Sequence, residues 1–395
     1  MRYLRSIFLV ACLLPSSAAL ADCRNTLDFN QWLNQFKREA ATAGLSPQVM
    51  DKALQGLTPD PEVIRRDRSQ HVFAQTFLEF SAKKVSRHRL THGRNHLKRN
   101  AALFRRIEQQ FGVPGEVLAA FWGLESDFGV VTGNYPTLRS VLTLAYDCRR
   151  PELFRPELMG ALWLIQKGDL TAANMRGAWA GELGQLQFLP SRYNQYAVDY
   201  DRDGHRDLIR SSADALASAA RLLKKYGWRA GEPWLQEVRV PTEMDWSLAR
   251  LNNKLALAEW KKQGVTLVNG QPLPNAGRAA LLLPMGRNGP AFLAYPNFDV
   301  FLKWNESTVY STTAAYLATR FAGAPALRAG NAPVAKLSIG QVKQLQSKLK
   351  ARGLPVGKID GIIGEMTRDA VRRIQQQLGL PADGYPDPEL LRRLR

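Results

Sequence analysis

Long apolar runs, acidic side chains and cysteine are all scarce in this sequence of 395 residues. No run approaches the roughly 20 apolar residues of a membrane-spanning helix, so a polytopic membrane protein is excluded. The hydrophobic fraction of 45% and charged fraction of 23% also exclude fibrous and low-complexity classes. Only 35 acidic residues oppose 54 basic ones, and the net charge of +19 predicts attraction to a polyanion or an anionic surface. Nucleic acid, anionic lipid and an acidic cell-wall polymer all fit this charge.

The start of the chain has the pattern of a cleaved export signal. Two arginines precede the apolar run of residues 7–14, and residues 19–21 offer the small side chains that signal peptidase reads. We therefore predict a signal peptide at residues 1–21 and an exported mature protein with no transmembrane segment. A lipoprotein box ending at Cys12 is the alternative, although it would leave a very short apolar region before the cleavage site.

Removal of the signal would take Cys12 with it and leave two cysteines. Cys23 and Cys148 would then share an oxidising compartment, which predicts a disulfide between the new N-terminus and the core. Two unrelated buried thiols are the alternative.

Between Glu79 and Glu108 every charged residue is basic. We interpret this stretch as a solvated helix face and expect no nucleic-acid partner, because an exported protein rarely meets DNA.

The C-terminal region contains an internal duplication. Residues 326–337 lie in a stretch rich in Ala, Gly, Pro and Asn that predicts a linker. A helical pattern beyond it recurs 29 positions later, from Val342, Leu345, Gln346 and Leu349 to Val371, Ile374, Gln375 and Leu378. An Asp-Gly turn follows each copy, at residues 360–361 and 383–384. Residues 338–395 resemble the type 1 peptidoglycan-binding domain, which implies a binding module of three helices.

One acidic residue in the centre of the chain stands out. Residues 114–129 predict a helix whose apolar positions recur at steps of three and four, and Glu125 lies on that apolar stripe. A carboxylate there is costly to ionise, so its pKa should be raised and its acid form populated near neutral pH. A general acid needs this property. The alternative is a glutamate near a helix end that reaches solvent or pairs with an arginine.

A glycine-rich segment follows at residues 177–191. Its glycines at 177, 181 and 184 allow close backbone approach and positive φ, and it carries Gln187 beside an aromatic residue and a proline. A neutral amide beside a buried acid can orient that acid without neutralising it. We therefore expect Gln187 to lie near Glu125 or near the substrate.

Residues 125–129, 181–191 and 193–199 together resemble the lytic murein transglycosylase B family, in the family's order and spacing. Residues 304–310 match its late active-site segment, and the resemblance covers roughly residues 25–325. It implies a mainly α protein in which residues 22–325 form a lysozyme-like α+β catalytic domain with a helical flanking region. We expect a small β-hairpin at residues 279–294. The predicted cleaved signal peptide implies a periplasmic location.

The family implies cleavage of the β-1,4 bond between N-acetylmuramic acid and N-acetylglucosamine, leaving a 1,6-anhydromuramyl end without using water. Glu125 would act as acid and then as base, because Asp127 faces away from it on the helix. The resemblance places four further residues in the cleft: Ser126, Gln187, Asn305 and Tyr310. Independently of the resemblance, we consider Arg149 or Arg150 as the contact for the lactyl carboxylate; the alternative is that they are ordinary arginines of a basic surface. No cofactor is required. Peptidoglycan strands are the expected partner, and other cell-wall enzymes are considered.

Two departures keep alternatives open. Ala178 stands where the family often has serine, and Glu182 stands in a usually uncharged position. Glu182 as a second carboxylate would give a muramidase that uses water. A wall-binding scaffold without catalytic activity is the rival from another class.

Residues 199–210 have the ligand spacing of a calcium loop. Oxygen donors fall at positions 1, 3, 5 and 9, which are Asp199, Asp201, Asp203 and Asp207. Position 6 is glycine, and position 7, His205, needs only a backbone carbonyl. Position 12 should be glutamate and is Arg210. Some family members close the loop with a later aspartate, so we predict Asp214 as the last ligand of a structural calcium. An Asx-rich turn braced by arginines is the alternative.

Overall fold

The computed structural model describes residues 25, 27–69 and 75–394, which form seventeen α-helices and seven short strands. This confirms the predicted mainly helical fold with a small β element. The predicted signal peptide and Cys23 lie outside the described residues. None of the helices within the described ranges has both the length and the apolar character to cross a membrane.

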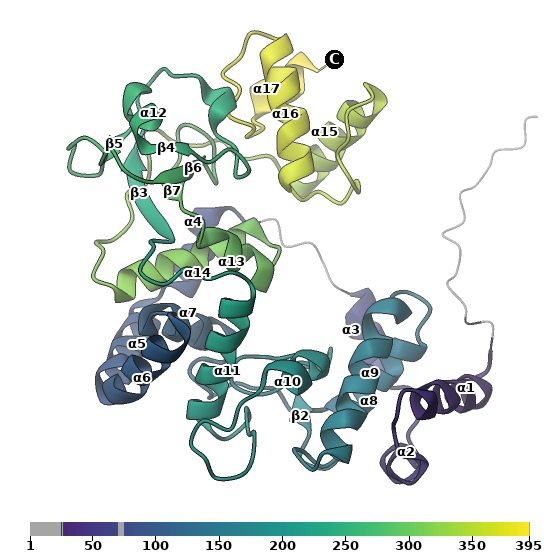
Figure 1. Cartoon of the computed structure of the whole chain (residues 1–395). Helices are drawn as coiled ribbons and strands as arrows, with labels where there is room; N and C mark the ends of the chain where they lie inside the picture. Colours follow the sequence, from purple (N-terminus) through teal and green to yellow (C-terminus); the bar gives the residue numbers. More distant parts are fainter. Residues whose placement is uncertain (1–24, 26, 70–74, 395) are drawn as a thin grey trace, which may run out of the picture.

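A first helical unit combines two separate parts of the chain, shown at the lower right of Figure 1. Its helices are α1 (Phe29–Thr42), α2 (Pro47–Leu54), α3 (Pro61–Arg68), α8 (Thr137–Tyr146) and α9 (Pro151–Gln166). Trp32 and Phe36 lie on the buried stripe of α1. The amide of Asp60 donates to the Thr143 hydroxyl at 2.8 Å, which ties the start of α3 to α8.

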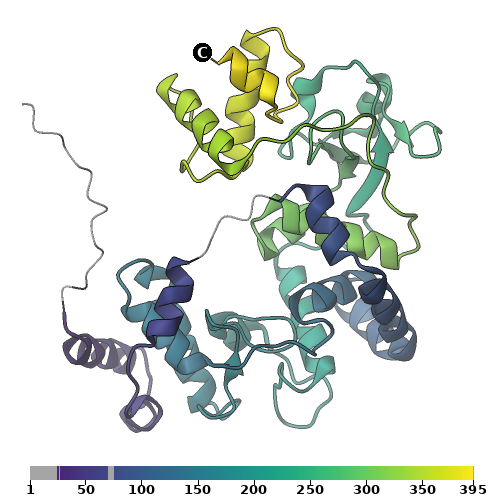
Figure 2. The same ribbon diagram turned by 180° about the vertical axis from the view of Figure 1, so that it is seen from behind.

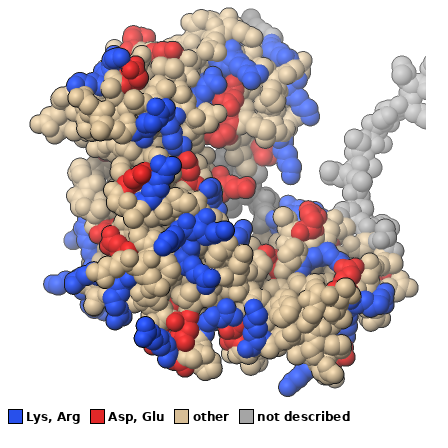
Figure 3. Space-filling model, in the orientation of Figure 1, with Lys and Arg blue, Asp and Glu red and all other residues tan. Residues whose placement is uncertain are grey.

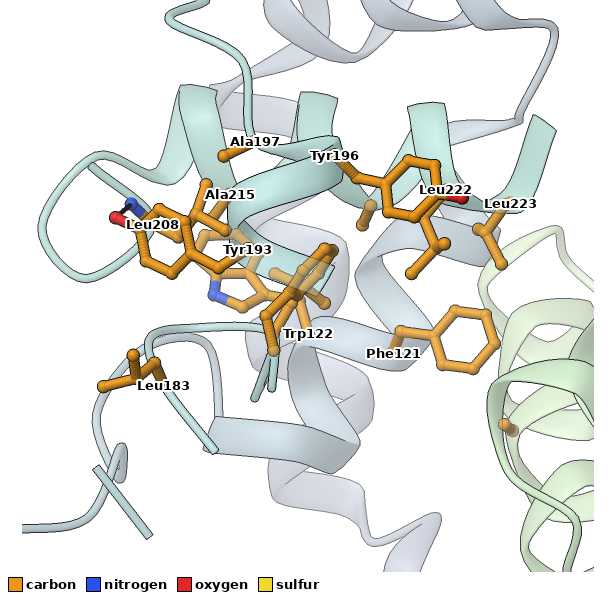
Figure 4. Packing of buried hydrophobic residues seen from close by; sticks show 14 of the residues in the cluster. Phe121, Trp122, Leu183, Tyr193, Tyr196, Ala197, Leu208, Ala215, Leu222 and Leu223 are labelled. Atoms are coloured by element: carbon orange, nitrogen blue, oxygen red, sulfur yellow. Dashed lines mark hydrogen bonds between the residues drawn. The ribbon is translucent and has the colours of Figure 1, made fainter. Parts of the chain in front are cut away.

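The central unit surrounds α7 (Gly115–Ser126), which is almost wholly buried. Four helices pack against it: α5 (Arg87–Arg99), α6 (Ala101–Phe111), α11 (Ser212–Lys225) and α14 (Thr308–Phe321). Figure 4 shows part of this core, with Phe121 of α7 near Leu222 and Leu223 of α11. The unit also contains α4 (Phe77–Lys84), α10 (Pro190–Tyr196) and α13 (Phe298–Trp304). Gly123 permits the packing, because a Cβ there would lie 2.8 Å from the Phe128 ring.

The β element is larger than the predicted hairpin. β6 (Arg278–Leu282) and β7 (Ala291–Ala294) do pair antiparallel, but they lie inside a five-stranded sheet of order β4-β6-β7-β3-β5. The added strands are β3 (Leu235–Arg239), β4 (Leu255–Ala256) and β5 (Thr266–Leu267). The sheet carries its own apolar core, together with α12 (Leu257–Lys262) and a 3₁₀ turn at Trp246–Leu248. β1 (Tyr135–Pro136) and β2 (Arg176–Gly177) form a separate two-residue pair.

The segment predicted as a linker is packed along the sheet. The amide of Arg328 donates to Glu237 Oε1 at 3.1 Å, and the amide of Asn331 donates to the Asn288 carbonyl at 2.8 Å. Figure 2 shows this segment passing from α14 along the sheet to the last three helices. These are α15 (Ile339–Ala351), α16 (Glu365–Gln377) and α17 (Pro388–Arg393), around one small apolar core.

Candidate active site

Glu125 lies in the last turn of α7, with its neighbours Phe121 and Trp122 buried below it. Two donors from the far end of the chain reach its carboxylate. Trp304 Nε1, at the end of α13, donates to Glu125 Oε1 at 2.9 Å, and the Tyr310 hydroxyl, in the first turn of α14, donates to the same oxygen. The Trp304 ring also packs on Phe121 with its centroid at 4.4 Å, which fixes its orientation.

Burial raises the pKa of Glu125, and this is the largest influence on it. The hydrogen bonds from Tyr310 and Trp304 oppose that shift, because they stabilise the ionised form. The nearby charge of Glu182 raises this pKa further, whereas Lys84 lowers it. The pKa of Tyr310 is raised well above its usual value by burial and by Glu125, so its hydroxyl remains a donor. The raised pKa expected from the apolar stripe is therefore present.

The chain turns sharply directly after α7. Asp127 and Phe128 both have positive φ, at 48° and 63°, a conformation that residues with a side chain rarely adopt. Asp127 is held by the buried Arg89 side chain, whose Nε donates to its carboxylate at 2.9 Å. The same Nε donates to the Gly123 carbonyl at 2.8 Å. Asp127 is thus held by Arg89 at the left-handed cap that ends α7, and it does not lie on the helix as the sequence prediction assumed.

Ser126, which follows Glu125 at the end of α7, is buried. Its side chain is 2% exposed, so it does not line an open cleft. Its hydroxyl donates to the Gln185 carbonyl at 2.6 Å and accepts from the Gly129 amide at 2.8 Å. In this structure Ser126 positions the end of α7 against the glycine-rich segment, because its hydrogen-bonding groups are already occupied.

The glycine-rich segment approaches its neighbours as closely as its composition predicted. A Cβ at Gly184 would lie 2.3 Å from the Leu208 carbonyl oxygen. Gln187 has a φ of 50°, and its amide nitrogen donates to the Gly184 carbonyl at 2.8 Å and to the Thr132 carbonyl at 3.2 Å. Its amide therefore shapes the loop here, and the two groups that orient Glu125 are Trp304 and Tyr310.

Gln185 was missed by the sequence reasoning. It is buried, and its side-chain oxygen accepts from Trp122 Nε1 at 3.0 Å. Its backbone amide donates to the Leu208 carbonyl at 2.9 Å. Gln185 therefore joins α7 to two loops. Gln185 and Gln187 lie two positions apart in one segment, and spacing alone did not distinguish their roles.

Asn305 and Arg150 are both half-buried. Asn305 directly follows Trp304, and its side-chain oxygen accepts from the Ser307 amide at 2.9 Å, which starts α14. Arg150 pairs with the buried Asp67, which also accepts from Arg149 at 2.6 Å. Asp67 is 1% exposed, so these two arginines neutralise a buried carboxylate.

Glu182 also has a raised pKa, chiefly because it is buried. Hydrogen bonds from the backbone of Glu182 and Ala180 and the charge of Arg150 oppose the shift. The charge of Glu182 contributes to the raised pKa of Glu125, so the two carboxylates are close enough to interact electrostatically.

The predicted calcium loop is present only in part. The carboxylates of Asp199, Asp201 and Asp203 offer oxygens that all lie within 4.8 Å of one another, which suits a hard cation. Asp214 is different: it is fully buried, and its two oxygens accept from the amides of Tyr200 at 2.7 Å and Asp207 at 2.8 Å. Asp214 thus braces the loop from behind, and its role as a ligand stays a prediction. The exposed His205 donates its amide to Asp203 at 2.8 Å.

Cys148 is disulfide-bonded. Its predicted partner, Cys23, lies outside the described residues, so that pairing stays a prediction.

Figure 3 shows Lys and Arg side chains distributed over all parts of the visible face, without one dominant basic patch.

The fold and the site define the class of protein. Residues 28–319 match the family described as the transglycosylase SLT domain, and residues 338–394 match a putative peptidoglycan binding domain. The chain belongs to the transglycosylase SLT domain family.

Individual relatives agree with this assignment. Membrane-bound lytic murein transglycosylase B of Escherichia coli K12 is 33% identical over 212 residues, which are 52% of this chain and 56% of that protein. The match thus spans little more than half of that relative. The structure of SltB3 from Pseudomonas aeruginosa in complex with NAG-NAM-pentapeptide superposes with a TM-score of 0.87 at 44% identity, covering 93% of this chain and all of that one. Slt35 of Escherichia coli in complex with calcium has a TM-score of 0.62 at 27% identity and covers 73% of this chain and 92% of that one.

Proposed function

We propose that this protein is a lytic transglycosylase of the periplasm that cleaves the β-1,4 bond between N-acetylmuramic acid and N-acetylglucosamine in peptidoglycan. The observation that carries the proposal is one carboxyl group, that of Glu125, with a raised pKa and two neutral donors fixed on a single oxygen. Family membership and the likeness to SltB3 bound to a peptidoglycan fragment support the substrate class.

In the proposed reaction Glu125 begins in its acid form. It gives its proton to the glycosidic oxygen as the bond to C1 of the muramyl sugar breaks. The resulting carboxylate then takes the proton of the muramyl 6-hydroxyl while that oxygen bonds to C1. The proton count closes without water, Glu125 returns to its acid form, and the product ends in a 1,6-anhydromuramyl residue.

Tyr310 and Trp304 support both halves of this cycle. Their hydrogen bonds stabilise the carboxylate formed after the first proton transfer, and both contact Oε1, so Oε2 is left to face the sugar. We assign Gln187, Asn305 and Arg150 to the walls of the substrate cleft, where Asn305 follows Trp304 directly and Arg150 lies near Glu182. The same proposal places a signal peptide at residues 1–21.

Tyr310→Phe should shift the pH dependence of the reaction. Loss of the hydroxyl removes a hydrogen bond that lowers the pKa of Glu125, so this pKa rises further. Because the acid form starts the reaction, the high-pH limb of kcat should move to higher pH, while kcat falls by roughly 10-fold or more. The measurement is product release from purified sacculi across pH.

Tyr316→Phe is the matched control for this experiment. Tyr316 lies on the same helix, and its hydroxyl accepts from the Leu327 amide at 2.9 Å, away from Glu125. The high-pH limb of kcat of Tyr316→Phe should stay where it is in the unsubstituted protein. If Tyr310→Phe also leaves the limb in place, Tyr310 does not tune Glu125.

The nearest alternative is a muramidase that uses water with Glu182 as a second carboxylate. The observation that favours it is the electrostatic influence of Glu182 on Glu125. The two reactions differ in their products, because hydrolysis leaves reducing ends and the proposed reaction leaves anhydro ends.

We also propose that Asp199, Asp201 and Asp203 hold a structural calcium ion. Bound calcium would cross-link the loop and leave the chemistry at Glu125 untouched. Thermal unfolding should therefore occur at a higher temperature in calcium than in EDTA, with about 2.7 kcal/mol of stabilisation when calcium is at one hundred times its Kd.

Asp201→Asn should remove most of this calcium response. His205→Ala should retain it, because a loop of this kind uses only the backbone carbonyl at that position. Identical unfolding of the parent protein in calcium and in EDTA would refute the calcium proposal.

A further inference from the structure

The two repeats of the C-terminal module are built alike. In the first, the side chain of Gln346 accepts from the Gly361 amide at 2.9 Å and donates to Asp360 at 3.1 Å. In the second, Gln375 accepts from the Gly384 amide at 2.8 Å and donates to Asp383 at 2.9 Å. Each glutamine thus holds the Asp-Gly turn of its own repeat.

The turn glycines identify the equivalent surface of each repeat. A Cβ at Gly384 would meet Arg372 and the Arg368 carbonyl, whereas a Cβ at Gly361 would meet Ile339 and Lys343. Arg368 and Arg372 lie 29 positions after Ile339 and Lys343, which is the offset of the duplicated helices. Each repeat therefore has an equivalent face, formed by the first turns of its helix and by the residue that follows its turn glycine. That residue is Ile362 in the first repeat and Tyr385 in the second.

The face of the second repeat is already occupied by the main chain of the sheet unit. Arg368 donates to the carbonyls of Leu283 at 3.1 Å and Pro284 at 2.6 Å. Arg372 donates to the Ala249 carbonyl at 2.7 Å, and both arginines are buried. Asp383 accepts from the Arg287 amide at 2.9 Å. This face thus binds peptide carbonyls and a peptide amide.

The same face of the first repeat is open to solvent. Ile339 is 39% exposed, Ile362 is 48% exposed, and Lys343 between them is also exposed. Residues 339–366 carry four of the eight large hydrophobic side chains that are exposed among the described residues. Two of these four, Ile339 and Ile362, flank the Gly361 turn, and adjacent exposed apolar side chains are typical of an interaction surface. Figure 1 shows α15 on the outer side of the module, away from the sheet.

We propose that the open face of the first repeat, formed by Ile339, Lys343 and Ile362, binds the peptide stems of peptidoglycan. This inference rests on the proposed function and adds which polymer component the module recognises. The occupied face of the second repeat holds a peptide backbone, so the same framework suits a peptide on the first. Lys343 complements the carboxylates of a stem peptide, and the two isoleucines complement its alkyl side chains. Residues 339–366 contain no aromatic side chain on which a sugar ring could stack.

The contact between the second repeat and the sheet unit also fixes the position of the module. Because the second repeat is fixed to the sheet unit through buried arginines, the module acts as a fixed part of the enzyme. Stem peptides bound at the first repeat would then hold the glycan at a set distance from Glu125.

The test uses the full chain carrying Glu125→Gln, so that the sacculi are not digested during the measurement. Cosedimentation with purified sacculi is compared between this protein and a version with Lys343→Glu and Ile362→Asp added. We expect about tenfold weaker binding, because the changes place acidic groups opposite the stem carboxylates. Arg373→Glu is the control for the Lys343→Glu change, since it makes the same charge reversal at an exposed position of α16 and should bind normally.

Sacculi stripped of their peptides by an amidase provide the second arm. Binding of the parent protein should fall to the level of the double variant, and free stem pentapeptide should compete for intact sacculi. Equal binding of parent and double variant, or full binding to stripped sacculi, would overturn the proposal. Failure of the proposed function would appear separately, as a lack of anhydro products from the chain with Glu125 intact.

Discussion

Glu125→Gln should abolish the release of anhydromuropeptides from sacculi. General acid and base catalysis each contribute about 10²- to 10⁴-fold, and a single group here performs both, so we expect a loss of at least roughly 10³-fold. Glutamine has nearly the same shape, and its side-chain oxygen can still accept from Trp304 and Tyr310. The fold should therefore survive, and only the transferable proton is lost.

Mass spectrometry of the soluble products measures this effect, with Glu182→Gln as the companion variant. Anhydro ends from the parent and from Glu182→Gln, with none from Glu125→Gln, would support the single-carboxylate mechanism. Reducing ends from the parent, together with inactivity of Glu182→Gln, would instead establish hydrolysis with two carboxylates. Unchanged activity of Glu125→Gln would contradict both mechanisms.

The raised pKa of Glu125 could be predicted from the sequence because its signal is local. An acidic residue on the apolar stripe of one helix must be buried, and burial raises its pKa whatever lies beyond the helix. The repeat in the C-terminal module was likewise legible, because each Gln and its Asp-Gly turn lie within fifteen residues of each other.

The groups that tune Glu125 could not be derived from local pattern. Trp304 and Tyr310 lie 179 and 185 positions away from it, and only the packing of α7 against α13 and α14 brings them together. The family resemblance placed Tyr310 in the cleft without assigning its contact. Strands β4 and β5 were missed for a related reason: each has two residues, too few to show a period, and each forms only by pairing with a distant strand.

The charge pattern of the sequence did not predict three buried arginines. Arg89 belongs to a basic stretch interpreted as solvated, yet it is buried and binds Asp127 and a helix carbonyl. Arg368 and Arg372 had no assigned role, and the structure uses both to bind main-chain carbonyls of another unit. A guanidinium offers five donors, so it can be buried wherever carbonyls converge, and sequence spacing does not reveal such places.

Asp214→Ala should destabilise the protein strongly even when no calcium is available. Asp214 is fully buried and accepts from the amides of Tyr200 and Asp207, so alanine leaves two buried N–H groups without their partner. Each unpaired group costs about 1–3 kcal/mol, and we expect a total loss of roughly 3–5 kcal/mol. Urea unfolding in EDTA, followed by tryptophan fluorescence, measures the loss.

Comparing stability in EDTA and in calcium shows whether Asp214 braces the loop or binds calcium. If Asp214 served mainly as a calcium ligand, its replacement would lower stability only in the presence of calcium. As a brace it should lower stability equally in both solutions, and Asp214→Asn, which keeps one acceptor, should recover about half of the loss. Asp203→Ala provides the contrast, because this exposed aspartate should change stability by less than about 0.5 kcal/mol in EDTA and abolish the response to calcium. Equal stability of Asp214→Ala and the parent in EDTA would return Asp214 to the calcium site as a ligand.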